Sequence, residues 1–353
     1  MGTNQISPAQ QLQTDITSTR TDFSRVSANA RLTSVSSDFS SLDNAISNLP
    51  LRLQKARDRK YAFNKRFESQ AQEFQKQWSL TRGQVMSRIT SETNLLQRDL
   101  RFLESRVSSL NTVTSNSGSV KALRSEISAF DSKIKASERT IKGLFSNLEN
   151  QVRQIESQLD TIEKSLEWFE TASFTLLATE GIVRAVKAVW TRDGKEDKDD
   201  PEGYLFLTDQ RLLFEQRQEI ATKKVLFVTT ERKKVQELLF EVPVFSITNI
   251  EASKRGMLKN EDWISLNFES GVFAANAQLH LDGQDSTEWQ RLINQVKARE
   301  LDDDRAFEID QEALDKVKAA PVICPHCGGS LSAPVLRGMD SIKCQFCGNL
   351  IKL

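Results

Sequence analysis

The chain has 353 residues and carries 48 Lys and Arg residues against 48 Asp and Glu residues, so its formal net charge is zero. This balance excludes a general attraction to polyanions, and any affinity for nucleic acid or lipid must come from a local patch. Hydrophobic residues make up 38% of the chain, against about 45–50% in ordinary globular domains, which favours a partly elongated molecule.

The sequence contains no apolar stretch long enough for a membrane-spanning helix, which needs about 20 residues. Its first residues also lack the basic and apolar segments of a signal peptide. We therefore expect a cytoplasmic protein, with peripheral attachment to the inner face of a membrane as an open alternative.

Residues 1–173 are predicted to form a helical coiled coil. Apolar residues recur in alternating steps of three and four from Leu32 to Leu49, from Leu53 to Leu110, and most regularly from Val120 to Phe169. This period places apolar side chains on one stripe of a helix, and partner helices bury that stripe. The turn residues at 112–119 have no periodicity, so we expect the helices to fold back there as an antiparallel hairpin.

A break is expected at Pro50, which would let the first helical run fold against the hairpin as a third helix. Helices with one apolar stripe must pair with each other or with another chain, so a homo-oligomer is expected. Two interpretations stay open. The region is either a spacer or oligomerisation stalk, or a unit that forms filaments or remodels membranes.

Cations are concentrated shortly after Pro50, with Tyr61, Phe63 and Phe67 interleaved. A basic helix with aromatic residues can lie on an anionic membrane or follow the phosphates of nucleic acid. The alternative is a solvated coiled-coil face whose aromatic residues form the buried seam. The basic helix patch consists of Arg52, Lys55, Arg57, Arg59, Lys60, Lys65 and Arg66.

Residues 174–301 have the pattern of a small antiparallel β-barrel closed by a C-terminal helix. The helix is expected to begin at a cap formed by Ser286 or Thr287 and to bury Trp289 as its largest anchor. Short runs of β-branched and aromatic residues bounded by turn residues are typical of strands. The predicted strands are Ile182–Trp190, Gly203–Thr208, Arg211–Phe214, Val225–Thr229, Glu237–Val242, Ile247–Ala252, Trp263–Phe268 and Val272–Leu281.

Two segments of this region resemble the GRAM and bacterial PH-like superfamily. The first is Gly203–Phe214, which contains Thr208-Asp209-Gln210-Arg211, and the second is Glu241–Ile250. The resemblance covers residues 177–300 and implies a PH/GRAM-like domain. Members of this superfamily bind phosphoinositides or proteins, or serve as scaffolds, so the fold alone does not give the ligand.

A phosphate-binding site of the PH type would need clustered cations near the first hairpin loop. In the loop at 191–200, carboxylates outnumber cations, which disfavours phosphate. A better candidate for binding a membrane or a partner is a predicted loop tip in which apolar residues lie among cations. This candidate consists of Lys254, Arg255, Met257, Leu258 and Lys259, and the alternative is that its apolar residues pack on the protein.

The acidic linker at 302–321 is followed by a tail that contains all four cysteines. They form two C-x2-C pairs separated by sixteen residues, which is the spacing of a zinc site. Tetrahedral coordination of structural Zn²⁺ would supply the stability that so short a tail lacks. We expect the ligands to be Cys324, Cys327, Cys344 and Cys347, with His326 as a less favoured replacement for one sulfur.

The segment 322–353 also resembles the short bacterial zinc-ribbon family. Its apolar packing is expected to come from Ile323, Leu331, Ile342, Phe346 and Ile351. A closed site with four protein ligands has no open position for water, so a structural role is expected.

We find no nucleotide-binding, esterase or metalloprotease motif, and His280 lies in a predicted strand. The sequence therefore predicts a non-enzymatic adaptor or scaffold. It would self-associate through its coiled coil and dock to a membrane surface or a protein partner through the PH/GRAM-like domain. The alternatives are a membrane-remodelling or filament-forming protein, and a zinc-ribbon protein associated with nucleic acid.

Overall fold

The computed structural model describes residues 7–191, 194–225, 228–256, 260–331 and 335–353. The chain divides into two compact units. The first consists of Met1–Pro50 and Ser69–Glu156, and the second of Leu51–Glu68 and Ser157–Leu353.

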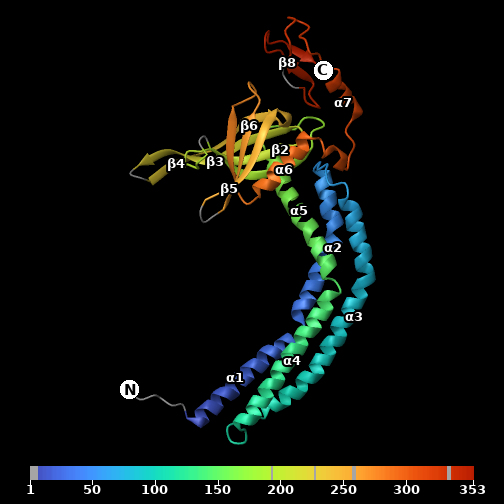
Figure 1. Ribbon diagram of the computed structural model, residues 1–353, viewed down its shortest axis with the longest axis vertical. Coiled ribbons are helices and arrows are strands. Elements are labelled where there is room, and N and C mark those ends of the chain that lie inside the picture. The colour runs from blue at the N-terminus through green and yellow to red at the C-terminus, as the bar shows by residue number, and fades with distance from the viewer. Residues whose placement is uncertain (1–6, 192–193, 226–227, 257–259, 332–334) are drawn as a thin grey trace. The chain divides into compact units, whose positions relative to one another are not determined.

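The first unit is made of helices, three of which, α1, α3 and α4, lie side by side (Figure 1). Ion pairs between Arg106 and Glu126 and between Lys133 and Asp99 show that α3 and α4 run antiparallel. The predicted reversal at 112–119 is therefore confirmed. The long helices of the chain are α1 (Pro8–Asn29), α2 (Thr33–Asp58), α3 (Phe67–Ser108), α4 (Ser117–Gly143) and α5 (Ser146–Glu170).

The apolar positions predicted for α4 are buried in the first unit. They lie three or four residues apart, so they share one face, and each contributes about 1.5–3 kcal/mol when fully buried. These positions are Val120, Leu123, Ile127, Phe130, Ile134 and Ile141.

Helix α1 has no counterpart in the predicted pattern, because its Ser-, Thr- and Gln-rich sequence carries only a sparse apolar stripe. Ile16 and Val26 are nevertheless buried. The helix begins at a capping box in which the Ser7 hydroxyl accepts from the Gln10 amide and the Gln10 side chain accepts from the Ser7 amide.

The predicted break at Pro50 is wrong, because α2 continues through this residue to Asp58. Leu49 and Leu53 on either side of Pro50 are buried, and their packing outweighs the lost backbone hydrogen bond. The chain leaves the helix only afterwards, where Lys60 and Asn64 adopt φ values of 66° and 57°. Phe63 lies in this connection and not on a helix, so it is not part of a helical seam.

The second unit contains a seven-stranded sheet in the order β4-β3-β2-β1-β7-β6-β5, with every neighbouring pair antiparallel. Helix α6 (Ser286–Lys297) packs against β5 and β6, and Trp289 is 0% exposed, as predicted. The strands are β1 (Ile182–Thr191), β2 (Glu202–Thr208), β3 (Arg211–Val225), β4 (Val228–Pro243), β5 (Ile247–Arg255), β6 (Glu261–Phe268) and β7 (Asn276–Leu281).

The structure differs from the predicted strands and cap in several details, and β3, β4 and β5 are longer than predicted. The separate strand predicted at Val225–Thr229 is wrong, because its ends belong to β3 and β4, whose pairing continues to Val225 and Val228. The last strand begins at Asn276 and not at Val272. The cap of α6 is Asp285, whose carboxylate accepts from the amides of the two residues that follow Ser286. A carboxylate also complements the helix dipole at this end.

The remainder of the second unit contains the short helix α7 (Gln311–Lys318) and a two-stranded antiparallel sheet of β8 (Ser341–Lys343) and β9 (Leu350–Lys352). Over the residues that the structure describes, none of the helices combines the length and the hydropathy that crossing a bilayer requires.

Replacing Pro50 with Ala restores a backbone donor inside α2 and should raise the free energy of unfolding by about 1–3 kcal/mol. Urea unfolding followed by circular dichroism measures this change. Pro8→Ala is the matched control, because Pro8 opens α1 where no helical donor is needed, so its effect should be small. An unchanged or lower free energy of unfolding in the Pro50 variant would show that Pro50 does not destabilise α2.

Candidate metal centre

The two C-x2-C pairs form turns of the same geometry. In the first turn the Gly328 amide donates to the Cys324 carbonyl at 2.9 Å, and in the second the Gly348 amide donates to the Cys344 carbonyl at 2.9 Å. Gly328 and Gly348 have φ values of 71° and 75°, which glycine adopts without strain. Each turn therefore presents both of its sulfurs on one side.

The four sulfur atoms lie within 4.8 Å of one another. The Sγ–Sγ distance is 3.7 Å both for Cys324 with Cys347 and for Cys327 with Cys344. A disulfide would bring two sulfurs to about 2.05 Å. A tetrahedral site with zinc–sulfur distances of about 2.3 Å places its sulfurs about 3.8 Å apart. The donor set and its spacing thus fit Zn²⁺.

The local backbone favours a thiolate at Cys344. The amides of Cys347 and Phe346 donate to its sulfur, the latter at 3.4 Å, and lower the pKa of Cys344 to about 6. A deprotonated sulfur is the form that binds zinc. His326 is exposed on the first turn, and the described cluster is formed by the four cysteines.

The tail around this cluster has a very small core. Its buried residues are Cys324, Ile342, Cys344 and Ile351, with Leu331 among the partly buried side chains packed against them. The prediction that Ile323 and Phe346 join this core is wrong, because both are exposed. Two of the four buried residues in this described cluster are candidate metal ligands.

The tail lies against the turn between β2 and β3, whose sequence is Thr208-Asp209-Gln210-Arg211. Arg211 pairs with the fully buried Glu180, its Nε lying 2.8 Å from Glu180 Oε1, and with Glu241 at 2.7 Å. The Thr208 hydroxyl donates to Glu180 and accepts from the Arg211 amide. Thr208 and Arg211 therefore fix the turn by neutralising and solvating one buried carboxylate.

The side chain of Asp209, at the tip of the same turn, is 2% exposed and binds two arginines from the C-terminal part of the chain. Its Oδ2 accepts from Arg305 at 2.6 Å and also from Arg337, and its Oδ1 accepts from the Gly181 amide at 2.8 Å. Burial raises the pKa of Asp209, and the two guanidinium groups oppose this shift. We call Asp209, Arg305 and Arg337 the carboxylate clamp.

The clamp residues were not among the residues predicted from sequence for any site. The motif that contains Asp209 was recognised only as a sign of the fold. Arg305 and Arg337 lie 96 and 128 residues from Asp209 along the chain, and no periodicity connects them with it.

Two of the cations predicted to bind a membrane or a partner, Lys254 and Arg255, have internal partners. Lys254 pairs with Asp262 at 2.5 Å. Arg255 donates to the Gly194 carbonyl at 3.0 Å and lies over the Trp263 ring. The other three predicted residues, Met257, Leu258 and Lys259, lie outside the described part of the chain.

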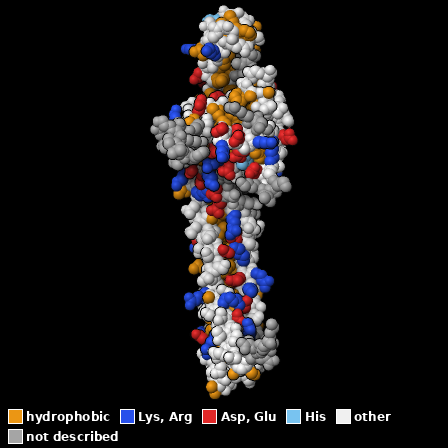
Figure 2. Space-filling view, turned by 90° about the vertical axis from the view of Figure 1, so that its left-hand side faces the viewer, with side chains coloured by type: hydrophobic (Ala, Val, Ile, Leu, Met, Phe, Trp, Pro, Cys, Tyr) orange, Lys and Arg blue, Asp and Glu red, His pale blue; other side chains and the backbone are white. Residues whose placement is uncertain are grey.

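Several cations of the basic helix patch are also engaged. Arg57 is the most buried of them, and it pairs with Glu68 and donates to the carbonyls of Tyr61 and Phe63. Arg52 pairs with Asp160 and Glu163, Arg59 with Glu170, and Lys65 donates to the Asp303 carbonyl. Lys55, Lys60 and Arg66 are the remaining members. On the face drawn in Figure 2, Lys and Arg side chains lie among Asp and Glu side chains.

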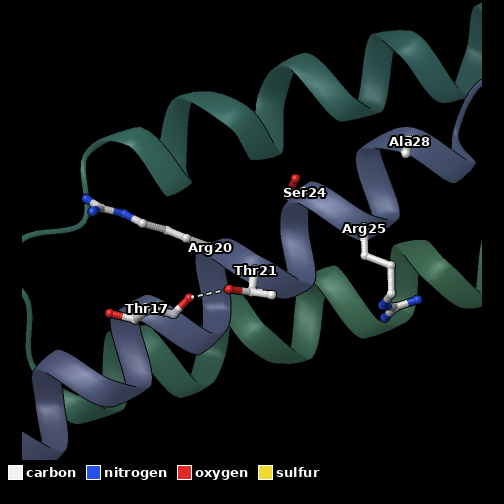
Figure 3. Close-up of a pocket in the computed structure, with 6 residues that line it drawn as sticks. All are labelled: Thr17, Arg20, Thr21, Ser24, Arg25 and Ala28. Atoms are coloured by element: carbon white, nitrogen blue, oxygen red, sulfur yellow. Dashed lines mark hydrogen bonds between the residues drawn. The ribbon is translucent and has the colours of Figure 1, made fainter.

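A shallow pocket along α1 in the first unit is lined by Thr17, Arg20, Thr21, Ser24, Arg25 and Ala28 (Figure 3). Its two arginines point in different directions. Arg20 donates to the Leu110 carbonyl at 2.6 Å, and Arg25 pairs with Asp131 at 3.2 Å. These contacts hold helices together, and the arginines do not converge on a common ligand position.

No protein-family model matches this sequence, and no curated protein matches it. Among solved structures, the N-terminal PH domain of Vps36 is 15% identical over 36% of this chain and 86% of that chain, with a TM-score of 0.25. A DUF1696-family protein with a pleckstrin-homology domain from Shewanella loihica is 15% identical over 39% of this chain and 92% of that chain, with a TM-score of 0.23. The Slm1 PH domain in complex with inositol-4-phosphate is 13% identical over 33% of this chain and 95% of that chain, with a TM-score of 0.21.

The full chain purified without chelator should contain one zinc per molecule, measured by atomic emission spectrometry. Cys344→Ser should lose most of this metal, because the remaining three sulfurs cannot close the tetrahedron. His326→Ala is the matched control and should keep the metal, because the four sulfurs already form a complete set. Zinc-free wild-type protein, or loss of zinc in the histidine variant, would contradict the assignment.

Proposed function

We propose that this protein is a non-enzymatic adaptor that self-associates through its helices and docks to a protein partner. In this proposal the sheet and α6 form a PH/GRAM-like domain, and the C-terminal tail is a zinc ribbon with a structural ion. Four sulfurs at the separations of a tetrahedral site carry the zinc part of the proposal. The ion would bind, align and stiffen the two turns of the tail.

Exposed apolar side chains on the tail support docking to a protein. Ile323 and Phe346, which were expected inside, face solvent together with Val322 and Leu350. Where such side chains form a contiguous apolar patch, that patch is typical of a surface that contacts another protein. Phe346 also lies against Gly329, where an added Cβ would come within 2.6 Å of the ring, so the position of this aromatic residue is defined.

An exposed apolar stripe on α3 supports self-association. Leu80, Leu95 and Phe102 are all exposed, Phe102 by 68%. At about 100° per residue they lie within about 60° of one another around the helix axis, so they share one face. A second copy of the same stripe would bury these side chains, as in symmetric pairs of helices.

A protein partner is better supported than an anionic membrane. Lys254 and Arg255, the described cations of the predicted membrane-binding loop, have partners within the sheet domain. Arg52, Arg57 and Arg59 of the basic helix patch are paired with carboxylates. Cations already paired gain less from lipid phosphates, because binding would have to break the existing contacts.

Sedimentation velocity of the zinc-loaded full chain should show a species larger than the monomer. Leu95→Glu with Phe102→Glu should shift it to monomer, because charges would replace the apolar stripe. Met86→Glu is the matched control, because Met86 is also exposed but lies on another face of α3. A monomeric wild-type protein would contradict the proposed self-association.

Mixing the same samples with vesicles that contain anionic lipid distinguishes docking to a protein partner from docking to a membrane. Protein that stays in the supernatant at physiological salt supports a protein partner. Salt-sensitive co-sedimentation that is lost in Met257→Asp with Leu258→Asp would instead establish the membrane alternative.

A further inference from the structure

The tail is attached to the sheet through a small polar interface centred on Arg337. The Arg337 amide donates to Gln210 Oε1 at 2.6 Å, and the Arg337 carbonyl accepts from Gln210 Nε2 at 2.8 Å. Its guanidinium group binds Asp209. The Gln210 side chain thus binds both the amide and the carbonyl of Arg337, and Asp209 binds its guanidinium group.

The next residue, Gly338, approaches the backbone that precedes β1. It has a φ value of 86°, and an added Cβ would lie 2.8 Å from the Ala178 amide nitrogen. This approach requires a glycine and a defined loop shape. The contact is therefore specific to one conformation of the chain around Gly338.

That loop depends on the two cysteine pairs. Arg337 lies between Cys327 and Cys344, so the loop that presents it begins and ends at the two turns. Among the described tail residues, the core cluster contains four buried ones, and two of these are cysteines of the candidate site. A metal ion held by all four sulfurs would join the two ends of the loop more strongly than the small described core does.

Asp209 of the clamp also has partners that do not belong to the tail. Asp209 also accepts from Arg305 at 2.6 Å and from the Gly181 amide at 2.8 Å, and it would keep these two partners if Arg337 departed. The buried carboxylate is then still paired, so release does not leave an isolated buried charge. Departure of the tail would uncover apolar side chains in the cavity of about 390 Å³ next to the clamp, among them Val244 and Val296.

We propose that the tail is a metal-dependent latch: it docks on the Asp209–Gln210 turn when its four cysteines hold their ion, and it leaves when the ion is removed. This inference rests on the proposed zinc site and adds a conformational consequence to it. The state of the metal then sets whether the apolar surface beside α6 is covered.

Hydrogen exchange of the full chain, with and without a zinc chelator, tests the latch. The segments to follow are 177–181 on the sheet side and 335–340 on the tail side. Chelation should speed exchange in both segments at least about tenfold, because Gly338 of the docked tail lies against the Ala178 and Thr179 amides and the Arg337 amide donates to Gln210. Exchange in α4 of the helical unit should stay unchanged.

Arg337→Ala separates docking from metal binding. This variant should keep its zinc and yet show the fast exchange of 177–181 with the metal present. Lys352→Ala is the matched control, because it removes a tail cation that the clamp does not use. Circular dichroism of both variants verifies that the sheet remains folded.

The possible results also distinguish the latch from the zinc site. Protein that contains no zinc contradicts both. Protein that contains zinc, and whose segments 177–181 and 335–340 exchange equally slowly after its removal, contradicts the latch and leaves the zinc site standing. Slow exchange of 177–181 in Arg337→Ala likewise overturns the role given to the clamp.

Discussion

Buried carboxylates at the start of the sheet constrain the second unit. Glu180 and Asp209 are both removed from solvent, and an unpaired buried carboxylate costs several kcal/mol. Their guanidinium partners are Arg211 on β3, Arg305 in the segment after α6, and Arg337 in the tail between its cysteine pairs. Segments far apart in the chain are thus held at one turn because two charges must be neutralised there.

This constraint explains why the acidic stretch after α6 is ordered against other parts of the second unit. Arg305 binds Asp209 and lies over the Phe63 ring at 5.2 Å. On either side of it, the Asp304 carbonyl accepts from the Lys65 amide, and the Ala306 amide donates to the Ala62 carbonyl. Composition alone predicts a solvated acidic linker here. Backbone hydrogen bonds and one arginine join it to the connection between α2 and α3.

Predictions from the sequence were accurate where one local pattern decides the structure. The heptad from Val120 to Ile141 gives the buried face of α4, and two C-x2-C pairs bring four sulfurs together. Prediction failed where tertiary packing overrides a local rule, as at Pro50, which lies inside a helix held by its buried neighbours. The partners of Asp209 could not be predicted, because a buried ion pair between distant segments leaves no local signal.

The two proposals have a common physical basis. In both proposals, a short tail with a small core would need an ion to fold, and the folded tail places Arg337 on Asp209 while it keeps Phe346 exposed. The metal site, the clamp and the exposed apolar residues are therefore parts of one arrangement. A structural ion would act on docking through the shape of the loop between the cysteine pairs.

The most direct test of this account is a double-mutant cycle between Asp209→Asn and Arg337→Met, read as the opening free energy of the zinc-loaded tail by hydrogen exchange. If the two side chains hold the tail through one charge pair, the double variant should be scarcely weaker than either single variant, with a coupling of about 1–3 kcal/mol. Additive effects would show that the pair does not hold the tail on the sheet, which would contradict the proposed latch.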